Sequence, residues 1–427
     1  ANQWSERDGA EQRLVPGCFG IFGHGNVAGV AQALLEVADT GELPYHLARN
    51  EQGMVHAAVG YARMRNRLQL MACTASIGPG STNMLTGAAL ATTNRIPVLL
   101  LPSDVFATRV ASPVLQELEQ PWSYDVSVND AFRPLSRFFD RVWRPEQLPA
   151  ALLGAMRVLT DPAETGAVTI ALPQDVQAEA FDWPDELFAE RVWHVGRPAI
   201  EVNAQLRAEE LIRTARKPLL VAGGGVHYSE ATRALREFAD ITGFPVADTQ
   251  AGKGALPWDH PCAVGGLGST GSPVANALAR EADLVIGVGT RWSDFTTASR
   301  TAFQNPDVRF VNLNIAAFDA AKHAGEMLVA DAQAGLFNLV GGLTSPRSAG
   351  FRKAENTWGE DVRRGNSVVD AAFHLGNQPL PAQSEVLGLD WIDRELAGLR
   401  YKQQALTNQI QRLVQQQQLL NERHMRL

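Results

Sequence analysis

A single carboxylate stands at the start of a segment with helical spacing, HLARNEQGMVHAAVGYAR (46–63). Asn50 is a suitable helix N-cap, and Glu51 directly follows it. Three apolar residues share the helical face of this acid: Val55, Ala58 and Ala62. Three small residues form a second ridge that another backbone can approach closely: Gly53, Ala57 and Gly60. A carboxyl held out of water in this way is a strong hydrogen-bond partner, which suits proton-sharing chemistry.

A glycine-rich turn, FGIFGHGNVAGV (19–30), joins a predicted strand to a helix start. Its glycines follow a GxGxxxG spacing related to the dinucleotide fingerprint: Gly23, Gly25 and Gly29. Glu51 lies just past the second predicted strand, where a ribose-binding acid can sit, so an NAD(P)-dependent oxidoreductase is one interpretation. Any tight turn between a strand and a helix favours glycine, however. His24 inside the turn is either a ligand contact or a solvent-facing loop residue.

A second turn of this kind is TASIGPGSTNML (74–85). Its Gly-Pro-Gly run fixes an unusual backbone, and Ser81, Thr82 and Asn83 then offer polar atoms at a helix N-terminus. A plain turn with a capping Ser or Thr does not explain the whole GPGSTN string, and a nicotinamide-binding domain has no need of it. In the second half of the chain, GGGV (223–226) lacks the GxGxxG spacing and gives little support for dinucleotide binding there.

Composition and charge limit the class of protein. The chain has 427 residues, of which 45% are hydrophobic and 20% charged, as in ordinary globular proteins with two or three domains. A net charge of −8 argues against nucleic acid as the main partner. The three cysteines are far apart in sequence, which predicts a reducing compartment and no zinc site. Neither a membrane span nor a signal peptide is recognisable, so we expect a cytoplasmic protein without a membrane partner.

The elements that position these residues alternate between short apolar runs and helical patterns. In residues 1–185 the predicted strands are 18–22, 44–48, 68–73, 96–101 and 167–172. After a charged, proline-containing stretch the alternation restarts in residues 200–343, with predicted strands at 218–224, 244–249, 283–289 and 308–314. SEATRALREFADITG between the first two of these is a predicted crossover helix. We therefore expect two doubly wound α/β domains with parallel sheets.

The last part of the chain has a different pattern. Residues 344–388 are rich in Ser, Pro, Arg and Asn and predict a linker. Residues 389–427 carry apolar residues at three-four spacing: Leu389, Ile392, Leu396, Leu399, Leu406, Ile410, Leu413 and Leu420. This pattern favours a long helix that self-associates as a coiled coil. The alternative is a lone amphipathic helix that docks on its own domain.

The order of several motifs resembles the thiamine-diphosphate enzymes of the acetohydroxyacid synthase type, over about residues 10–340. The motifs are FGIFGHGN, NEQGMVHAAVGYAR, GPGSTN, IALPQDVQ (170–177), PLLVAGGGV, GKGALPWDHP (252–261) and ADLVIGVGTRWSD (282–294). FGHGNVAG and the run at 104–138 look most like the branch that hydrolyses a carbon–carbon bond of trihydroxycyclohexane-1,2-dione in inositol catabolism. The resemblance thus implies a hydrolase of a cyclic dione; another lyase or synthase of the acetolactate synthase type is the alternative within the family.

The resemblance also implies roles for particular residues. The family's pyrimidine-binding domain, here 1–185, places a glutamate, matched by Glu51, against a ring nitrogen of the cofactor, where proton sharing prepares the cofactor's nucleophilic carbon. The cofactor cleft would be lined by Gly25, Asn26, Gly78, Pro79, Gly80 and Asn83. Gln116 would lie near the substrate, and His24 is the candidate for proton transfer at the reacting carbon. The plainer alternative for Glu51 is a buried acid satisfied by backbone donors.

The sequence departs from the family pattern in two places. The family has roughly one more helix before the first strand, and a third domain in which a GDG…N motif holds the Mg²⁺ that grips the diphosphate. No GDG occurs here, and LPAQSEVLG (380–388) looks like the point where that domain begins. We therefore expect no metal ligands in this chain, weak binding of thiamine diphosphate and no activity of the chain alone.

Partners follow from the same resemblance. Because the family's active site lies between two subunits, we expect a homo-oligomer, a dimer or tetramer, that acts on a small cyclic dione. Two interpretations from other classes remain: the NAD(P)-dependent oxidoreductase, which leaves GPGSTN unexplained, and a non-catalytic scaffold that assembles through residues 389–427.

Overall fold

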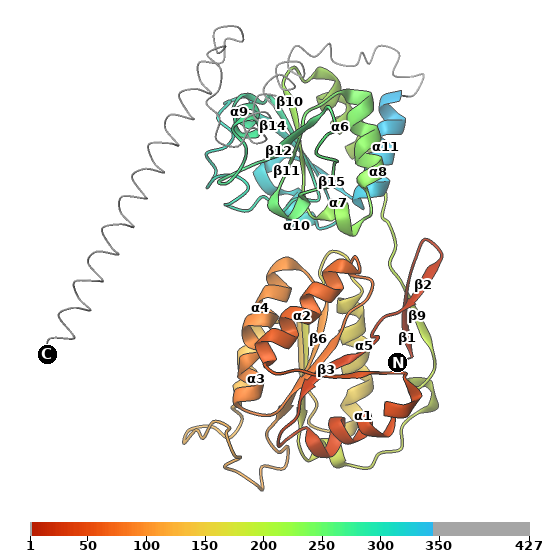
Figure 1. Cartoon of the computed structure of the whole chain (residues 1–427), viewed down its shortest axis with the longest axis vertical. Coiled ribbons are helices and arrows are strands. Elements are labelled where there is room, and N and C mark those ends of the chain that lie inside the picture. The colour runs from red at the N-terminus through yellow and green to blue at the C-terminus, as the bar shows by residue number, and fades with distance from the viewer. Residues whose placement is uncertain (1, 345–427) are drawn as a thin grey trace, which may run out of the picture.

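Two six-stranded sheets organise the chain. The computed structural model describes residues 2–344 (Figure 1). The strand orders are β4-β3-β5-β6-β8-β7 in the first sheet and β12-β11-β10-β13-β14-β15 in the second. All strand pairs within these two sheets are parallel, and helices cover both faces of each. The expected parallel-sheet α/β architecture is confirmed, whereas the predicted coiled coil at 389–427 and nearly all of the predicted linker at 344–388 lie outside the described residues.

The first sheet belongs to the N-terminal domain. Its strands are β3 (Cys18–Ile21), β4 (Tyr45–Leu47), β5 (Ala72–Ala75), β6 (Val98–Asp104), β7 (Phe138–Arg141) and β8 (Ala167–Pro173). Its main helices are η1 (Val27–Ala31), α1 (Gln32–Glu36), α2 (Glu51–Met64), α3 (Pro79–Asn83), α4 (Leu85–Asn94), η3 (Val128–Leu135) and α5 (Leu148–Leu159). The predicted strand at 68–73 is displaced to β5, because Leu70 donates its N–H to the carbonyl of Leu14 at 2.9 Å before the sheet begins.

The second sheet forms the central domain. Its strands are β10 (Pro218–Ala222), β11 (Val246–Asp248), β12 (Ala263–Gly266), β13 (Leu284–Val288), β14 (Arg309–Asn314) and β15 (Glu326–Val329). Its helices are α6 (Val202–Thr214), α7 (Gly225–Tyr228), α8 (Thr232–Thr242), α9 (Pro273–Glu281), α10 (Ala317–Ala320) and α11 (Ala332–Thr344). The four predicted strands are present, and the predicted crossover helix is α8, between β10 and β11. The two outermost strands, β12 and β15, were not predicted; they are four residues long and partly exposed.

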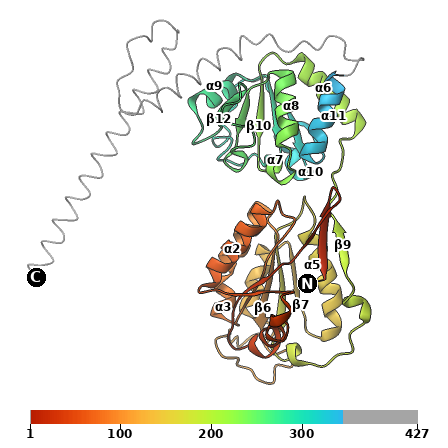
Figure 2. The same ribbon diagram turned by 45° about the vertical axis from the view of Figure 1, so that its right-hand side comes forward.

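A small third sheet supports the connection between the domains. It consists of β1 (Gln3–Arg7), β2 (Ala10–Arg13) and β9 (Arg191–His194). Strand β1 pairs with β2 in an antiparallel hairpin and with β9 in parallel, so that the start of the chain runs beside the connecting segment (Figure 2). The N-terminal hairpin therefore braces the segment that leads into the central domain.

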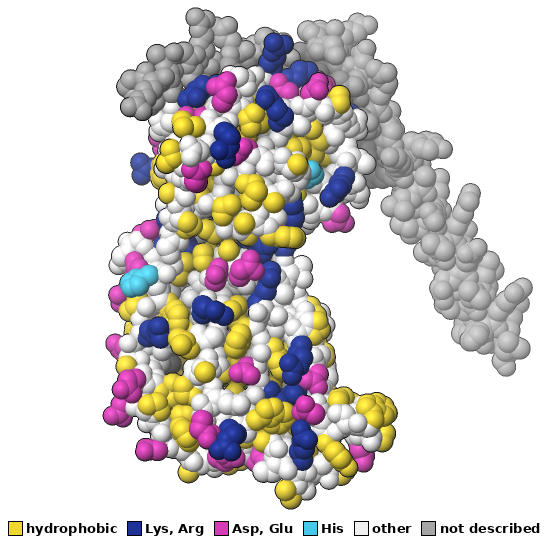
Figure 3. All heavy atoms as spheres, turned by 180° about the vertical axis from the view of Figure 1, so that it is seen from behind, with side chains coloured by type: hydrophobic (Ala, Val, Ile, Leu, Met, Phe, Trp, Pro, Cys, Tyr) yellow, Lys and Arg dark blue, Asp and Glu magenta, His cyan; other side chains and the backbone are white. Residues whose placement is uncertain are grey.

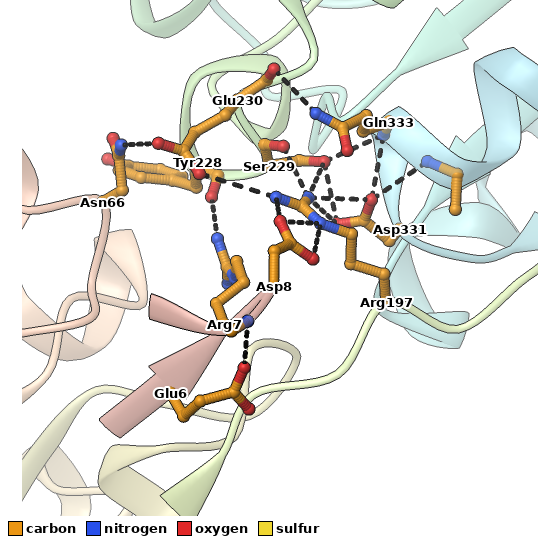
Figure 4. Close-up of polar contacts among 12 residues, drawn as sticks. Glu6, Arg7, Asp8, Asn66, Arg197, Tyr228, Ser229, Glu230, Asp331 and Gln333 are labelled. Carbon is orange, nitrogen blue, oxygen red and sulfur yellow. Dashed lines mark hydrogen bonds and ion pairs between the residues drawn. The ribbon is translucent and has the colours of Figure 1, made fainter. Parts of the chain in front are cut away.

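Arg197, just after β9, is the centre of a polar network between the hairpin and the central domain (Figure 4). Its Nη2 donates to Asp8 at 2.8 Å, and its Nη1 donates to the carbonyl of Ser229 at 2.6 Å and to Asp331 at 3.2 Å. Only 11% of the Arg197 side chain and 8% of that of Asp331 are exposed, so this charge-assisted bond is largely shielded from water, whereas Asp8 is 58% exposed. The two domains are thus joined by specific polar contacts in addition to the chain itself.

Candidate functional site

The helix that carries the acid begins where the sequence predicted. Asn50 is in an extended conformation and its side chain accepts the N–H of Gly53 at 2.8 Å, which caps α2. The apolar face is confirmed, since Val55, Ala58 and Ala62 are fully buried. This face fixes the roll of the helix and therefore the direction in which the side chain of its first residue can point.

The small-residue ridge of α2 does not receive another backbone within residues 2–344. Gly53, Ala57 and Gly60 are exposed, and a Cβ added at Gly60 would meet nothing within 4 Å. Close helix packing occurs elsewhere, where a Cβ at Gly87 of α4 would lie 2.4 Å from Val55. Within this part of the chain the buried face, and not the small-residue face, turns toward α4, so the approach of a backbone to the ridge stays a prediction.

Glu51 is partly buried and has one oxygen held by the second glycine-rich turn. Its Oε2 accepts a hydrogen bond from Nδ2 of Asn83 at 3.1 Å. Its Oε1 lies 3.5 Å from the point where a Cβ would stand on Gly80, and it accepts no hydrogen bond from any described residue. The plainer interpretation, an acid satisfied by backbone donors, does not describe this geometry. One oxygen is positioned and the other remains available for a ligand.

The first glycine-rich turn is built from inside the domain. Gly25 has φ of +99°, and a Cβ there would lie 2.2 Å from Oγ of Ser103, so only glycine fits. Asn26 is 1% exposed; its Oδ1 accepts the N–H of Gly23 at 3.1 Å and its Nδ2 donates to Thr74 at 3.3 Å. The Asn26 side chain therefore shapes the turn, and a cofactor contact at this position remains a prediction.

The second turn brings a distant loop to the site. Gly78 has φ of +64°, and a Cβ there would lie 2.0 Å from the carbonyl oxygen of Gln116, while Pro79 starts α3. Gln116 itself has φ of +63°, in the left-handed region that a residue with a side chain rarely adopts. Gly78 thus permits the loop at 105–127 to pack against the turn, which places Gln116 beside the predicted cofactor cleft.

His24 is held by the same loop. Its Nε2 lies 2.7 Å from the carbonyl oxygen of Leu115. Since a carbonyl only accepts, the ring must donate from Nε2. The structure therefore groups His24 with Gly78 and Gln116, and Glu51 with Gly80 and Asn83, and the 78–83 turn belongs to both groups.

A buried ion pair at the end of β6 is a feature that the sequence analysis missed. Asp104 is fully buried, and Nε of Arg141 donates to it at 2.6 Å. Burial by itself lowers the pKa of Arg141, but the charges and hydrogen bonds of Asp104 and Asp130 together outweigh this and raise it. The sequence signal was present: polar Ser103 and Asp104 end an otherwise apolar strand, at the edge of the sheet where site residues gather.

A separate cavity of about 750 Å³ lies between the two domains, and neither Glu51 nor His24 lines it. Five arginines contribute to its wall: Arg7, Arg63, Arg67, Arg95 and Arg291. Burial lowers the pKa of Arg67 to about 10. The wall also includes Asp161, His227 and Asp331, so the cavity has titratable side chains of its own and is distinct from the group around Glu51.

Comparison with protein families shows which class this architecture represents. Residues 10–122 match the thiamine pyrophosphate enzyme N-terminal TPP binding domain, and residues 206–339 match the thiamine pyrophosphate enzyme central domain. The chain therefore belongs to the thiamine pyrophosphate enzyme family and carries these two domains. All candidate site residues, from His24 to Gln116, fall within the first match.

Several curated proteins are similar to the chain over most of its length. It is 50% identical over 397 residues to a protein of Geobacillus thermodenitrificans, a match that covers 91% of this chain and 61% of the relative. It is 49% identical to proteins of Bacillus thuringiensis over 371 residues (86% of this chain, 57% of the relative) and Clostridium tetani over 367 residues (85% and 57%). All three are named 3D-(3,5/4)-trihydroxycyclohexane-1,2-dione hydrolase. The matches thus span 57–61% of the length of these relatives.

Two kinds of feature are absent from the described residues. Residues 2–344 contain no group of three or more His, Cys, Asp or Glu side chains arranged to hold a metal ion. In the same part of the chain, no helix is both long and apolar enough to cross a membrane.

Proposed function

We propose that this chain supplies the pyrimidine-binding and central domains of a thiamine-diphosphate-dependent hydrolase. Its substrate would be trihydroxycyclohexane-1,2-dione, whose ring carbon–carbon bond is cleaved in inositol catabolism. The names of relatives at 49–50% identity support the reaction. The observation that carries the proposal is Glu51, with one oxygen fixed by Asn83 and the other without a hydrogen-bond partner among the described residues.

The residues present fit the aminopyrimidine end of the cofactor. Thiamine diphosphate, when bound, supplies a carbon nucleophile that attacks a carbonyl of the substrate. The carboxyl of Glu51 would share a proton with a ring nitrogen of the pyrimidine, and the hydrogen bond from Asn83 to its Oε2 would keep it from turning away. The glycines of both turns allow backbone to approach the ligand closely. Mg²⁺ and the diphosphate are assigned to no residue of this chain.

His24 and Gln116 would act on the substrate side. Because Nε2 of His24 donates to Leu115, its Nδ1 carries a free electron pair that can take and return a proton during bond cleavage. Gln116 is brought beside the turn by Gly78 and offers an amide to the hydroxyl and carbonyl groups of the dione.

A chimeric enzyme tests this function. Residues 2–344 replace the matching region of the Geobacillus thermodenitrificans hydrolase, and ring opening of the dione is followed with thiamine diphosphate and Mg²⁺. We expect turnover, a loss of about 10²–10⁴-fold in Glu51→Gln and a smaller loss in His24→Ala. A folded chimera that binds the cofactor but leaves the dione intact contradicts the proposed reaction. An unchanged rate in His24→Ala removes the role of that residue.

The same material separates the alternatives. Condensation of pyruvate by the chimera, in place of dione hydrolysis, would indicate an enzyme of the acetolactate synthase type. Saturable binding of NADH would favour an oxidoreductase. A scaffold would give two results. The chimera would act on neither the dione nor pyruvate, and the assembly state of the full chain would change when residues 389–427 are removed.

We also propose that copies of the chain associate into a dimer or tetramer. The loop after β6 projects from the N-terminal domain and gathers hydrophobic side chains, at the lower right of Figure 3. Four of them are at least 71% exposed: Val110, Leu115, Trp122 and Tyr124. Exposed apolar patches of this kind often mark interaction sites. Sedimentation equilibrium measures the mass directly, and a monomer at all concentrations would contradict this part of the proposal.

A further inference from the structure

The loop at 105–127, which reaches His24, is held by few apolar contacts. Leu115 is 71% exposed and Leu118 is 45% exposed, so burial of their side chains does not fix this stretch. Gln116 between them adopts an unfavourable left-handed conformation, with φ of +63°. Such a conformation persists only when surrounding contacts impose it. Hydrogen bonds must therefore hold the chain where it meets the site.

Two carboxylates accept these bonds. Asp175 holds the beginning of the loop, and Glu117, inside the loop, binds the residue that follows its end. Asp175 accepts the N–H groups of Ala107 at 2.8 Å and Thr108 at 3.0 Å, which fastens the beginning of the loop. Glu117 accepts the N–H of Val128, the first residue of η3, at 2.7 Å. The second tie is close to the site, because Glu117 lies two residues after Leu115, whose carbonyl meets His24.

The carboxyl of Glu117 performs this task with one oxygen. Oε1 accepts both the N–H of Val128 and that of Leu118, the latter at 2.9 Å. Oε2 is buried and has no hydrogen-bond partner among the described residues. Burial, together with the charge of nearby Asp104, raises the pKa of Glu117. The two backbone donors and the charge of Arg141 lower it, but the net shift is upward. A neutral side chain with an oxygen in the Oε1 position would therefore keep both bonds.

We propose that Glu117 is a positioning residue for His24. By tying the loop to the start of η3, Glu117 holds the carbonyl of Leu115 against Nε2 of the imidazole. The ring then donates from Nε2 and presents Nδ1 as the proton acceptor, in one fixed orientation. The role of His24 in catalysis rests on the proposed function above, but its orientation by Glu117 is a property of this chain alone.

Exchange of the His24 Nε2 proton with water, followed by NMR of the full chain without cofactor, tests this. His24→Gln assigns the signal. We expect exchange to accelerate at least about tenfold in Glu117→Ala, because the proton loses its acceptor. Glu117→Gln should restore slow exchange, since its amide oxygen can accept the same two N–H groups. Glu119→Ala is the matched control, an exposed acid in the same loop, and should resemble the parent chain.

A second variant guards against misfolding of Glu117→Ala. Val128→Pro removes the donor and keeps the acid, and proline is tolerated at the first position of a helix. It should accelerate the exchange as Glu117→Ala does. Slow exchange in folded Glu117→Ala or Val128→Pro, or rapid exchange in the parent chain, overturns the proposal. Neither result depends on turnover, so failure of the dione hydrolase assignment would be seen separately in the chimera.

Discussion

Replacement of Arg141 by methionine tests the buried ion pair from which the loop after β6 departs. The side chain of Asp104 is 0% exposed and that of Arg141 is 5% exposed. Methionine fills part of the space of the arginine stem but leaves the carboxylate of Asp104 without its charged partner. Removal of one member of a buried pair costs about 3–5 kcal/mol. We expect the free energy of unfolding of the N-terminal domain, measured in urea at pH 7, to fall by about that amount.

The loss should depend on pH. Burial raises the pKa of a carboxyl that has no partner, so folded Arg141→Met binds a proton more tightly than the unfolded chain. The stability of the variant should therefore increase as the pH falls through this raised pKa and decrease as the pH rises. Arg144→Met is the control, because Arg144 and its partner Glu146 are 72% and 45% exposed, and we expect no measurable change. A loss below about 1 kcal/mol in Arg141→Met would refute the reasoning.

Two further perturbations address the loop. Gly78→Ala should lower the free energy of unfolding in urea by more than Gly41→Ala does. Both glycines have positive φ, for which a side chain costs about 1–2 kcal/mol. Only a Cβ at Gly78 would also meet a backbone oxygen, that of Gln116. Equal losses would contradict the contact. Burial by itself raises the pKa of Asp175, but the N–H groups of Thr108 and Ala107 outweigh burial and lower the pKa. The stabilisation that these hydrogen bonds give is therefore complete above about pH 4 and is lost as the pH falls further. Pepsin should then cut residues 105–127 faster below that pH, and Asp175→Asn should make the loop susceptible to neutral proteases; an equally resistant loop in both cases would exclude the tie.

Local signals in the sequence were sufficient for much of the fold. Alternating apolar runs and helical patterns predicted the parallel sheets because each buried strand and each crossover helix leaves its own periodicity. Asn50 predicted the start of α2 because capping depends on residues three positions apart. The glycines of the two turns were identified for the same reason, since a positive φ at Gly25 and Gly78 is a local requirement.

Contacts between distant residues were beyond these signals. The hairpin pairs Gln3 with Arg191, and the tie that orients His24 comes from Leu115, which is 91 positions away in the chain. Neither has a period or a motif. The ridge on α2 shows the same limit: small residues at helical spacing permit close packing, but only the tertiary arrangement decides which face of a helix meets a neighbour.

The central claim, that Glu51 faces the aminopyrimidine of the cofactor, can be tested on the chain without any assay of turnover. The measurement is the carboxyl ¹³C NMR signal of Glu51, assigned with Glu51→Gln, during titration with thiamine diphosphate and Mg²⁺. We expect a saturable displacement of this signal and none for exposed Glu146, even if binding is weak. A Glu51 signal that stays in place while the ligand shifts other resonances, or the absence of any saturable change, would contradict it.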